Sequence, residues 1–289
     1  MYIPLYNKSN YSLLSSMLTI DELVSFAVHH KISSMALSDD SMYGVMEFIK
    51  KCQKEKIKPI IGLTVTLADF VIVLYCKNYQ GYQNIIKLST IQSERVVEVD
   101  DLKKYSSDLV GVLPFSSYDK YSLLVNIYSD LFLGYSNKQE EKVVLLETKN
   151  VVFFPLNLYL YRTDSDYLSY LYKIRDGKTV SDDVEYDILN HELEISDLLE
   201  YTDNLGLLNT LKISDMCNLE FPKAKLLLPI YECSDPSKYL FELSKAGLNR
   251  RLGGKVSDKY RKRLSYELKI IDEMGFSNYF FVVYDFIKY

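Results

Sequence analysis

The sequence predicts an α/β domain followed by a helical region. Through the first hundred residues, short apolar segments typical of strands alternate with segments of helical periodicity. Strands that are separated by helices usually pair in parallel, so this alternation predicts a parallel sheet built from βαβ units. With 289 residues, 48% of them hydrophobic, the chain can bury a sizeable core.

The expected strands are the short apolar segments. We predict strands at residues 3–6, 34–37, 59–63, 70–75, 109–113 and 151–154. Helices are predicted over residues 43–54 and 82–88, and a further helix begins at a capping box formed by Thr19 and Glu22. The pattern leaves open whether the sheet closes into a barrel.

From Tyr167 onward the chain becomes helical. Ser234-Asp235-Pro236 is a strong helix start, because proline suits the first helical position. We therefore place a domain boundary near Glu232, which separates residues 1–232 from residues 233–289.

The last long helix is predicted from Asp258 to Met274, with Ser257 as its N-cap and Gly275 as its stop. One face of this helix carries an apolar stripe formed by Tyr260, Leu264, Leu268, Ile271 and Met274. Such a stripe requires a packing partner.

Cysteine usage and hydropathy exclude several classes of protein. Cys52, Cys76, Cys217 and Cys233 form no Cys-x-x-Cys pair, which argues against a zinc ribbon or a disulfide scaffold. The amino terminus lacks the pattern of a secretory signal, and no apolar stretch approaches the roughly 20 residues that a membrane helix needs. We expect a cytoplasmic protein.

Charge is unevenly distributed along the chain. The stretch from Lys245 to Lys269 contains nine basic residues and two acidic ones, Asp258 and Glu267. Its net charge is therefore +7, whereas that of the whole chain is −5. The candidates for contact with DNA or with another domain are Arg250, Arg251, Lys255, Lys259, Arg261, Lys262 and Arg263. A solvated helix face or a seam against further domains is the more ordinary explanation of such a cluster.

Several motifs carry a resemblance to a known family. A Tyr-x-x-Arg-Leu-x-x-Glu-Leu helix begins at Tyr260 and is followed by Met274-Gly275-Phe276, Tyr279-Phe280 and Asp285-Phe286. Three further segments, residues 10–14, 58–62 and 174–180, match the sequence pattern of the same family in their order and spacing. The chain thereby resembles the alpha subunits of bacterial DNA polymerase III, the C-family replicative polymerases, in the form found in low-GC Gram-positive bacteria.

The resemblance implies a specific fold. Residues 1–232 would form a PHP domain, the polymerase-and-histidinol-phosphatase module, which is a distorted (βα)7 barrel. Residues 233–289 would form the helical start of the polymerase core. We expect the parent protein to be longer than this segment, with its nucleotidyl-transfer site and the Mg²⁺ ions of that site beyond Tyr289.

An intact PHP domain holds up to three divalent metals with His, Asp, Glu and Cys side chains and hydrolyses phosphoesters. The resemblance places Tyr6, Lys8, Ser15, Asp40, Thr64, Leu156 and Leu158 at such ligand positions. A protonated lysine offers no lone pair and puts a positive charge where a cation would lie. We therefore expect no metal, no other cofactor and no catalytic residue in this segment.

Asp39 and Asp40 are the weak remaining candidates for metal binding. Side chains at adjacent strand positions point to opposite faces, which disfavours a shared cation. The alternative is that one of them caps the loop and helix that begin near Ser41 and Met42. His29 and His30 are expected at a helix end, and His191 in an acidic stretch, as ordinary surface or capping residues.

By resemblance, the segment supports the polymerase core and offers a docking face to replisome proteins. The implied partners are the rest of the polymerase chain, primer-template DNA, a sliding clamp and other replisome proteins, with no membrane. Two alternatives are a residual metal-dependent 3′–5′ exonuclease or phosphoesterase that uses Asp39 and Asp40, and a separate binding protein that ends at Tyr289.

Overall fold

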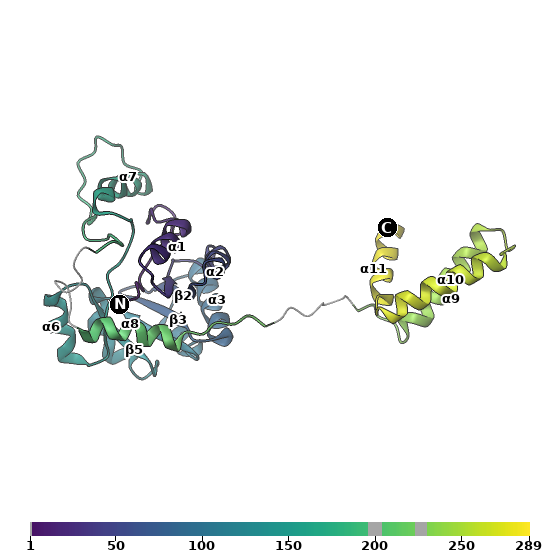
Figure 1. The fold of residues 1–289 in the computed structure, drawn as a ribbon, viewed down its shortest axis with the longest axis horizontal. Helices are drawn as coiled ribbons and strands as arrows, with labels where there is room; N and C mark the ends of the chain where they lie inside the picture. Colours follow the sequence, from purple (N-terminus) through teal and green to yellow (C-terminus); the bar gives the residue numbers. More distant parts are fainter. Residues whose placement is uncertain (1, 196–203, 223–229) are drawn as a thin grey trace. The chain divides into compact units, whose positions relative to one another are not determined.

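The computed structural model describes residues 2–195, 204–222 and 230–289. The chain divides into two compact units, Met1–Pro222 and Lys223–Tyr289, which are described separately (Figure 1). The boundary that the sequence predicts near Glu232 lies within the second unit. No helix in the described part of the chain is both long and apolar enough to cross a membrane.

The first unit contains a six-stranded sheet whose strands follow one another in chain order. The strands are β1 Ser34–Leu37, β2 Lys58–Thr66, β3 Val71–Cys76, β4 Leu109–Leu113, β5 Leu131–Tyr135 and β6 Val151–Phe153. Helices separate every consecutive pair of strands except β2 and β3. The predicted α/β class is confirmed, although β5 was not anticipated.

The prediction of a wholly parallel sheet was wrong at β3. This strand pairs antiparallel with both β2 and β4, whereas the β1–β2, β4–β5 and β5–β6 pairs are parallel. β2 and β3 are joined by a tight loop in which the Leu67 amide donates to the Phe70 carbonyl at 2.9 Å. So short a connection can only join antiparallel neighbours, because a parallel crossover needs about a dozen residues.

The predicted strand at residues 3–6 is not a strand in the structure. The end of this segment, Tyr6 and Asn7, nevertheless connects the two edges of the sheet. The Ser38 amide, just beyond β1, donates to the Asn7 carbonyl at 2.9 Å, and the Asn157 amide, beyond β6, donates to the Tyr6 carbonyl at 2.8 Å. This irregular segment therefore occupies the place where a regular barrel would have a further strand.

The three helices that the sequence predicts individually in the first unit are present, but three further helices between residues 99 and 147 were not predicted. Residues 176–195 contain no helix, although the chain was predicted to become helical from Tyr167 onward. The helices of this unit are α1 Ile20–His29, α2 Val45–Lys54, α3 Tyr79–Glu94, α4 Val99–Lys104, α5 Tyr121–Leu124, α6 Lys138–Glu147, α7 Ser165–Arg175 and α8 Asn204–Met216. The capping box of Thr19 and Glu22 is present at the start of α1. The helix predicted over residues 82–88 is the central part of the longer α3.

Helix α8 packs against β6 and also fixes the amino terminus (Figure 1). The Asn209 side chain donates to the Val151 carbonyl at 2.6 Å. The Thr210 hydroxyl accepts from the Ile3 amide at 3.0 Å. Both contacts are buried, so water cannot compete for the hydrogen bonds, and they join segments 58 and 207 residues apart in the chain.

The second unit consists of three helices, α9 Pro236–Arg251, α10 Asp258–Glu273 and α11 Ser277–Lys288. Asp235 caps α9 by accepting from the Lys238 amide, and Gly275 ends α10 with a φ of +71°. Phe281 of α11 is fully buried between the rings of Tyr231 and Tyr239, at centroid distances of 4.7 and 5.0 Å.

The apolar stripe predicted on α10 is only partly covered. Leu264, Leu268 and Ile271 are half-buried, whereas Tyr260 and Met274 remain 51% and 61% exposed. α9 packs against α10, but no residue of α10 is fully buried.

We predict that Gly81→Ala lowers the free energy of unfolding by about 1–3 kcal/mol, the usual cost of overpacking. A Cβ at Gly81, in the first turn of α3, would lie 2.1 Å from the Asp108 carbonyl oxygen, which the Lys77 amide already holds at 2.9 Å. Urea denaturation followed by circular dichroism measures the change. Gly247→Ala in α9 is the control, since no atom lies within 4 Å of its added Cβ. An unchanged midpoint for Gly81→Ala would contradict the tight packing.

Candidate functional site

Two carboxylates follow β1, at the carboxyl end of a strand, where α/β barrels place their active sites. Asp39 is 1% exposed and accepts three hydrogen bonds. The Ser9 amide donates at 2.6 Å, the Ser9 hydroxyl at 2.7 Å and the Ser12 hydroxyl at 2.8 Å. Asp39 therefore fixes the loop that follows the amino-terminal segment.

The side chain of Asp40 has a different partner. The Lys8 ammonium lies 2.7 Å from Asp40 Oδ1, with 14% of the Lys8 side chain and 38% of the Asp40 side chain exposed. The two neighbouring carboxylates thus bind different groups, one the serine donors and the other a buried cation. Among the described residues, the carboxylates of Asp39 and Asp40 therefore have no common binding partner.

The prediction that Asp39 or Asp40 caps the following helix was wrong. Helix α2 begins at Val45, its N-cap is Gly44, and no side chain caps it. The short turn between the strand and α2 leaves both carboxylates closer to the amino-terminal segment, which offers them an ammonium and two hydroxyls.

The electrostatics of Lys8 are set by opposing effects. Burial alone would lower the pKa of its ammonium, but Tyr6 and Asp40 raise it, so that the pKa lies above the usual value. Lys8 is therefore a permanent cation at neutral pH. Burial raises the pKa of the Tyr6 phenol, so Tyr6 stays neutral beside it. Burial also raises the pKa of Asp39, and the hydrogen bonds from Ser9 and Ser12 oppose that rise.

Asn7 lies between Tyr6 and Lys8 and has a purely structural role. Its side-chain amide donates to the Ala36 carbonyl at 2.9 Å and to the Pro4 carbonyl at 3.0 Å. Its oxygen accepts from the Asn157 side chain at 2.7 Å. The sequence did not indicate this pair of buried asparagines, because their pairing depends on contacts across 150 residues.

The other positions where a PHP domain would place ligands lie in two groups. The Thr64 hydroxyl is buried, donates to the Ser38 carbonyl at 2.6 Å and lies close enough to Tyr6 to influence its pKa. Thr64 therefore joins Tyr6, Lys8 and Asp40 at one place.

Ser15, Leu156 and Leu158 serve packing and loop geometry. The Ser15 hydroxyl reaches only the Leu13 carbonyl, at 3.4 Å, while the neighbouring Ser16 donates to the Lys8 carbonyl at 2.5 Å. Leu158 is buried in a small apolar cluster with residues of α7, and Leu156 is half-buried against it.

Helix α7 brings an aromatic side chain near this cluster. Tyr172 packs with Leu158 and Leu168, and both Lys8 and Asp40 influence its pKa, which burial raises above the usual value. The Arg175 guanidinium lies over the Tyr172 ring at 4.3 Å. The surroundings of the carboxylates on this side are thus apolar and aromatic.

The histidines contribute no ligand set to this cluster. His29 ends α1 and His30 is its C-cap, as predicted. His191 lies with Nδ1 3.2 Å from the Leu156 carbonyl oxygen. Among the described residues, no group of three or more His, Cys, Asp or Glu side chains could hold a metal ion.

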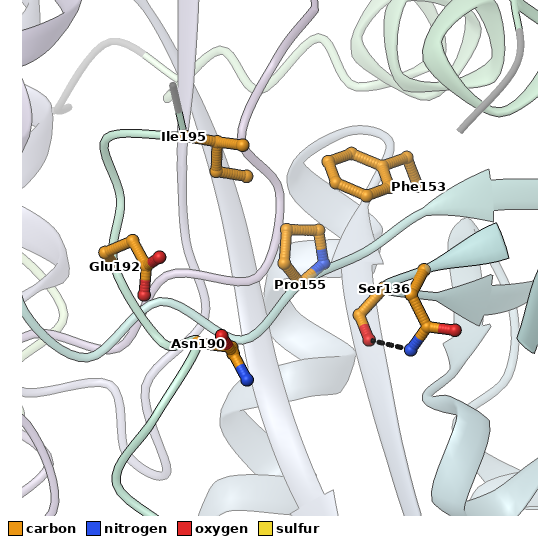
Figure 2. Close-up of a pocket in the computed structure, with 7 residues that line it drawn as sticks. Ser136, Phe153, Pro155, Asn190, Glu192 and Ile195 are labelled. Atoms are coloured by element: carbon orange, nitrogen blue, oxygen red, sulfur yellow. Dashed lines mark hydrogen bonds between the residues drawn. The ribbon is translucent and has the colours of Figure 1, made fainter. Parts of the chain in front are cut away.

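Cavities in the described part of the chain lie elsewhere. Figure 2 shows one of about 160 Å³, lined by Ser136, Asn137, Phe153, Pro155, Asn190, Glu192 and Ile195. Within it, the Asn137 side chain donates to Ser136 Oγ at 3.3 Å (Figure 2). The lining includes neither Lys8 nor Asp40, and it offers no paired carboxylates or nucleophile with a base.

The seven basic candidates lie in the second unit. They occupy the last turn of α9, the loop after it and the start of α10, and all seven are exposed. Arg263 makes an ion pair with Glu267 at 2.7 Å.

Two family profiles match the chain. The PHP domain profile matches residues 5–153, about half of the chain, and the profile described as the bacterial DNA polymerase III alpha NTPase domain matches residues 238–289. A solved amidohydrolase from Chromobacterium violaceum has a TM-score of 0.39 at 10% identity, over 53% of this chain and 86% of its own. That likeness is too low to carry an argument.

Curated relatives match along nearly the whole chain. The DNA polymerase III alpha subunit of Halalkalibacterium halodurans is 29% identical over 97% of this chain, and that of Ureaplasma parvum is 30% identical over 100%. The Bacillus subtilis subunit is 28% identical over 100%. The chain spans less than a third of each relative, 29%, 29% and 30% respectively. Together these matches show that the chain belongs to the PHP family, in the form that accompanies the polymerase sequence of DNA polymerase III alpha subunits.

Proposed function

We propose that the chain is the amino-terminal part of a replicative DNA-directed DNA polymerase and that its PHP domain is a catalytically inactive support for the polymerase core. The similarity to alpha subunits over both units supports the first part of the proposal. The contacts around Lys8 support the second.

The observation that carries the proposal is the ion pair between Lys8 and Asp40. A divalent metal needs lone pairs from its ligands, and the Lys8 ammonium supplies none. Its positive charge also repels a second cation, because the pair is largely shielded from water. Asp40 would be the best remaining metal ligand, but its carboxylate is already paired with the ammonium of Lys8, which belongs to the same chain.

The remaining side chains do not compensate for this loss. Tyr6 and Thr64 supply a neutral phenol and a hydroxyl, and Asp39 uses its oxygens to accept from Ser9 and Ser12. Metal-assisted hydrolysis needs a metal-bound water with a pKa near 7 as the nucleophile. The residues present do not fit the metals of an intact PHP domain, so no hydrolytic step follows from them.

The support role follows from what the cluster does hold. Lys8, Ser9 and Ser12 are bound to the carboxylates that follow β1, and this fixes the segment that connects the two edges of the sheet. The domain thus keeps its shape without a metal. We assign it no cofactor, and place Mg²⁺ in a polymerase site elsewhere in the parent chain.

The partners of the whole polymerase are part of the proposal. They are the remainder of the polymerase chain, primer-template DNA, a sliding clamp and other replisome proteins, in the cytoplasm. The domain is a docking face for such proteins rather than an enzyme.

Phosphoesterase assays test the inactivity directly. The chain, incubated with Mn²⁺ and either bis(p-nitrophenyl) phosphate or a 3′-labelled oligonucleotide, should release product no faster than the Asp39→Asn/Asp40→Asn variant. The variant is the matched control because it removes the remaining carboxylates while preserving their size. Hydrolysis that EDTA abolishes and the variant lacks would establish the residual exonuclease or phosphoesterase instead.

Removing the internal cation should destabilise the fold. We predict that Lys8→Met lowers the free energy of unfolding by about 1–3 kcal/mol, less than the 3–5 kcal/mol of a fully buried pair, because Asp40 is partly exposed. Adding Asp40→Asn should recover part of the loss, since it removes the unpaired charge.

Lys103→Met is the control for this pair of variants. Lys103 pairs with Asp100 at 2.9 Å, but the two side chains are 58% and 86% exposed, so little change is expected. Urea denaturation of wild type, Lys8→Met, Asp40→Asn and the double variant measures the coupling. Additive effects of the Lys8 and Asp40 substitutions would contradict the importance of the ion pair.

A further inference from the structure

The outer face of α10 is basic and carries an exposed tyrosine. Lys259, Lys262, Tyr266 and Lys269 are spaced three and four residues apart, which puts them on one side of a helix. All four are exposed, and Tyr266 is 57% exposed. The half-buried Leu264 and Leu268 lie on the opposite side. We call Lys259, Lys262, Tyr266 and Lys269 the basic face.

The end of α9 adds positive charge next to the start of this face. Arg250 and Arg251 lie in the last turn of α9, and Lys255 lies in the loop, all of them exposed. Gly253 and Gly254 adopt φ values of +58° and +80°, which a residue with a side chain rarely adopts. These glycines let the chain turn tightly, so the basic residues of both helices gather at one end of the hairpin.

The position of these cations opposes helix stability. A helix amino terminus already carries about half a positive charge, so basic residues there are unfavourable. α10 nevertheless has Lys259, Arg261 and Lys262 in its first turns, with Asp258 as the acidic residue of the first turn. Ser257 is the N-cap, but its side chain makes no capping hydrogen bond. Arg250 and Arg251 lie at the carboxyl end of α9, where basic residues are favourable, so the unfavourable charges are those at the start of α10.

Acidic neighbours neutralise only part of the charge. Arg263 pairs with Glu267 at 2.7 Å, and Lys269 lies 3.6 Å from Glu273. Lys259 and Lys262 have no ion pair within the described part of the chain. An anionic partner would reduce the repulsion between these lysines and the neighbouring cations.

Tyr266 indicates which anion fits. The Arg263 guanidinium lies 5.7 Å from the centroid of the Tyr266 ring, and the ring stays largely in contact with solvent. Surfaces that bind single-stranded nucleic acid combine cations, which contact the phosphates, with aromatic rings on which bases stack. An interdomain seam would instead be expected to present several apolar side chains, and this face has one aromatic ring among lysines.

We propose that the basic face, with Arg250, Arg251 and Lys255 beside it, binds the phosphate backbone of single-stranded DNA and that Tyr266 stacks on one of the bases. The choice of DNA as the nucleic acid rests on the proposed polymerase function. The charge and the stacking geometry rest on the hairpin alone.

Fluorescence anisotropy of a labelled oligothymidylate, titrated with the 289-residue chain, tests the proposal. At about 0.1 M salt, Lys259→Glu/Lys262→Glu should weaken binding by about tenfold or more. The slope of log affinity against log salt should also become shallower by about 1.4, since each phosphate contact to a single strand contributes about 0.7.

Tyr266→Ala separates stacking from charge. It should weaken binding by about tenfold, the effect of losing one stacked base, while leaving the salt slope unchanged. Lys50→Glu/Lys54→Glu on α2 makes the same change in net charge at exposed positions and is the control. Circular dichroism confirms that each variant keeps its helices.

Three results would overturn the proposal, and the first two concern the oligonucleotide itself. One is the absence of saturable binding at low salt, and the other is an equal loss in the α2 control, which would mean that only net charge matters. A preference for an acidic protein surface over the oligonucleotide would likewise assign the face to another class of partner. The inactivity of the PHP domain is tested independently by hydrolysis, so failure here leaves that proposal standing.

Discussion

The ion pair between Lys8 and Asp40 is the interaction on which the first unit most depends. Lys8 belongs to the irregular segment that connects the edges of the sheet, and Asp40 follows β1. Because this segment lacks regular strand pairing, its position is fixed by side chains, with Asp39 holding Ser9 while Asp40 holds Lys8. A metal would need the same carboxylates, and we therefore propose that the contacts that fix this segment also prevent the chemistry of an intact PHP site.

Local patterns in the sequence predicted much of the fold. The strand Leu109–Leu113, the capping box of Thr19 and the stop at Gly275 agree with the structure, because each is decided by neighbouring residues. β5 was missed although Leu131–Tyr135 is an apolar run of the same length as β4 and is flanked by the turn-forming pairs Ser129-Asp130 and Ser136-Asn137. The direction of β3 was wrong because the alternation of elements was extended across a tight loop that contains no helix.

The candidate site could be predicted only in part. The resemblance brought Tyr6, Lys8, Asp40 and Thr64 together, and the structure places them at one end of the sheet. The roles of Ser9, Ser12 and Asn157 could not be predicted, since they depend on contacts between segments far apart in the chain. The two units also differ in charge, because the exposed basic residues at the end of α9 and the start of α10 contrast with a chain whose net charge is −5.

We propose that the PHP domain supports the polymerase mechanically and contributes no chemistry. The most direct test is the primer-extension activity that a full-length polymerase retains after heating, compared between wild type and Gly81→Ala. We expect equal activity before heating and a lower temperature of inactivation for the variant, because its PHP domain unfolds first and leaves the core unsupported. Identical inactivation temperatures, with the PHP domain of the variant already unfolded, would contradict it.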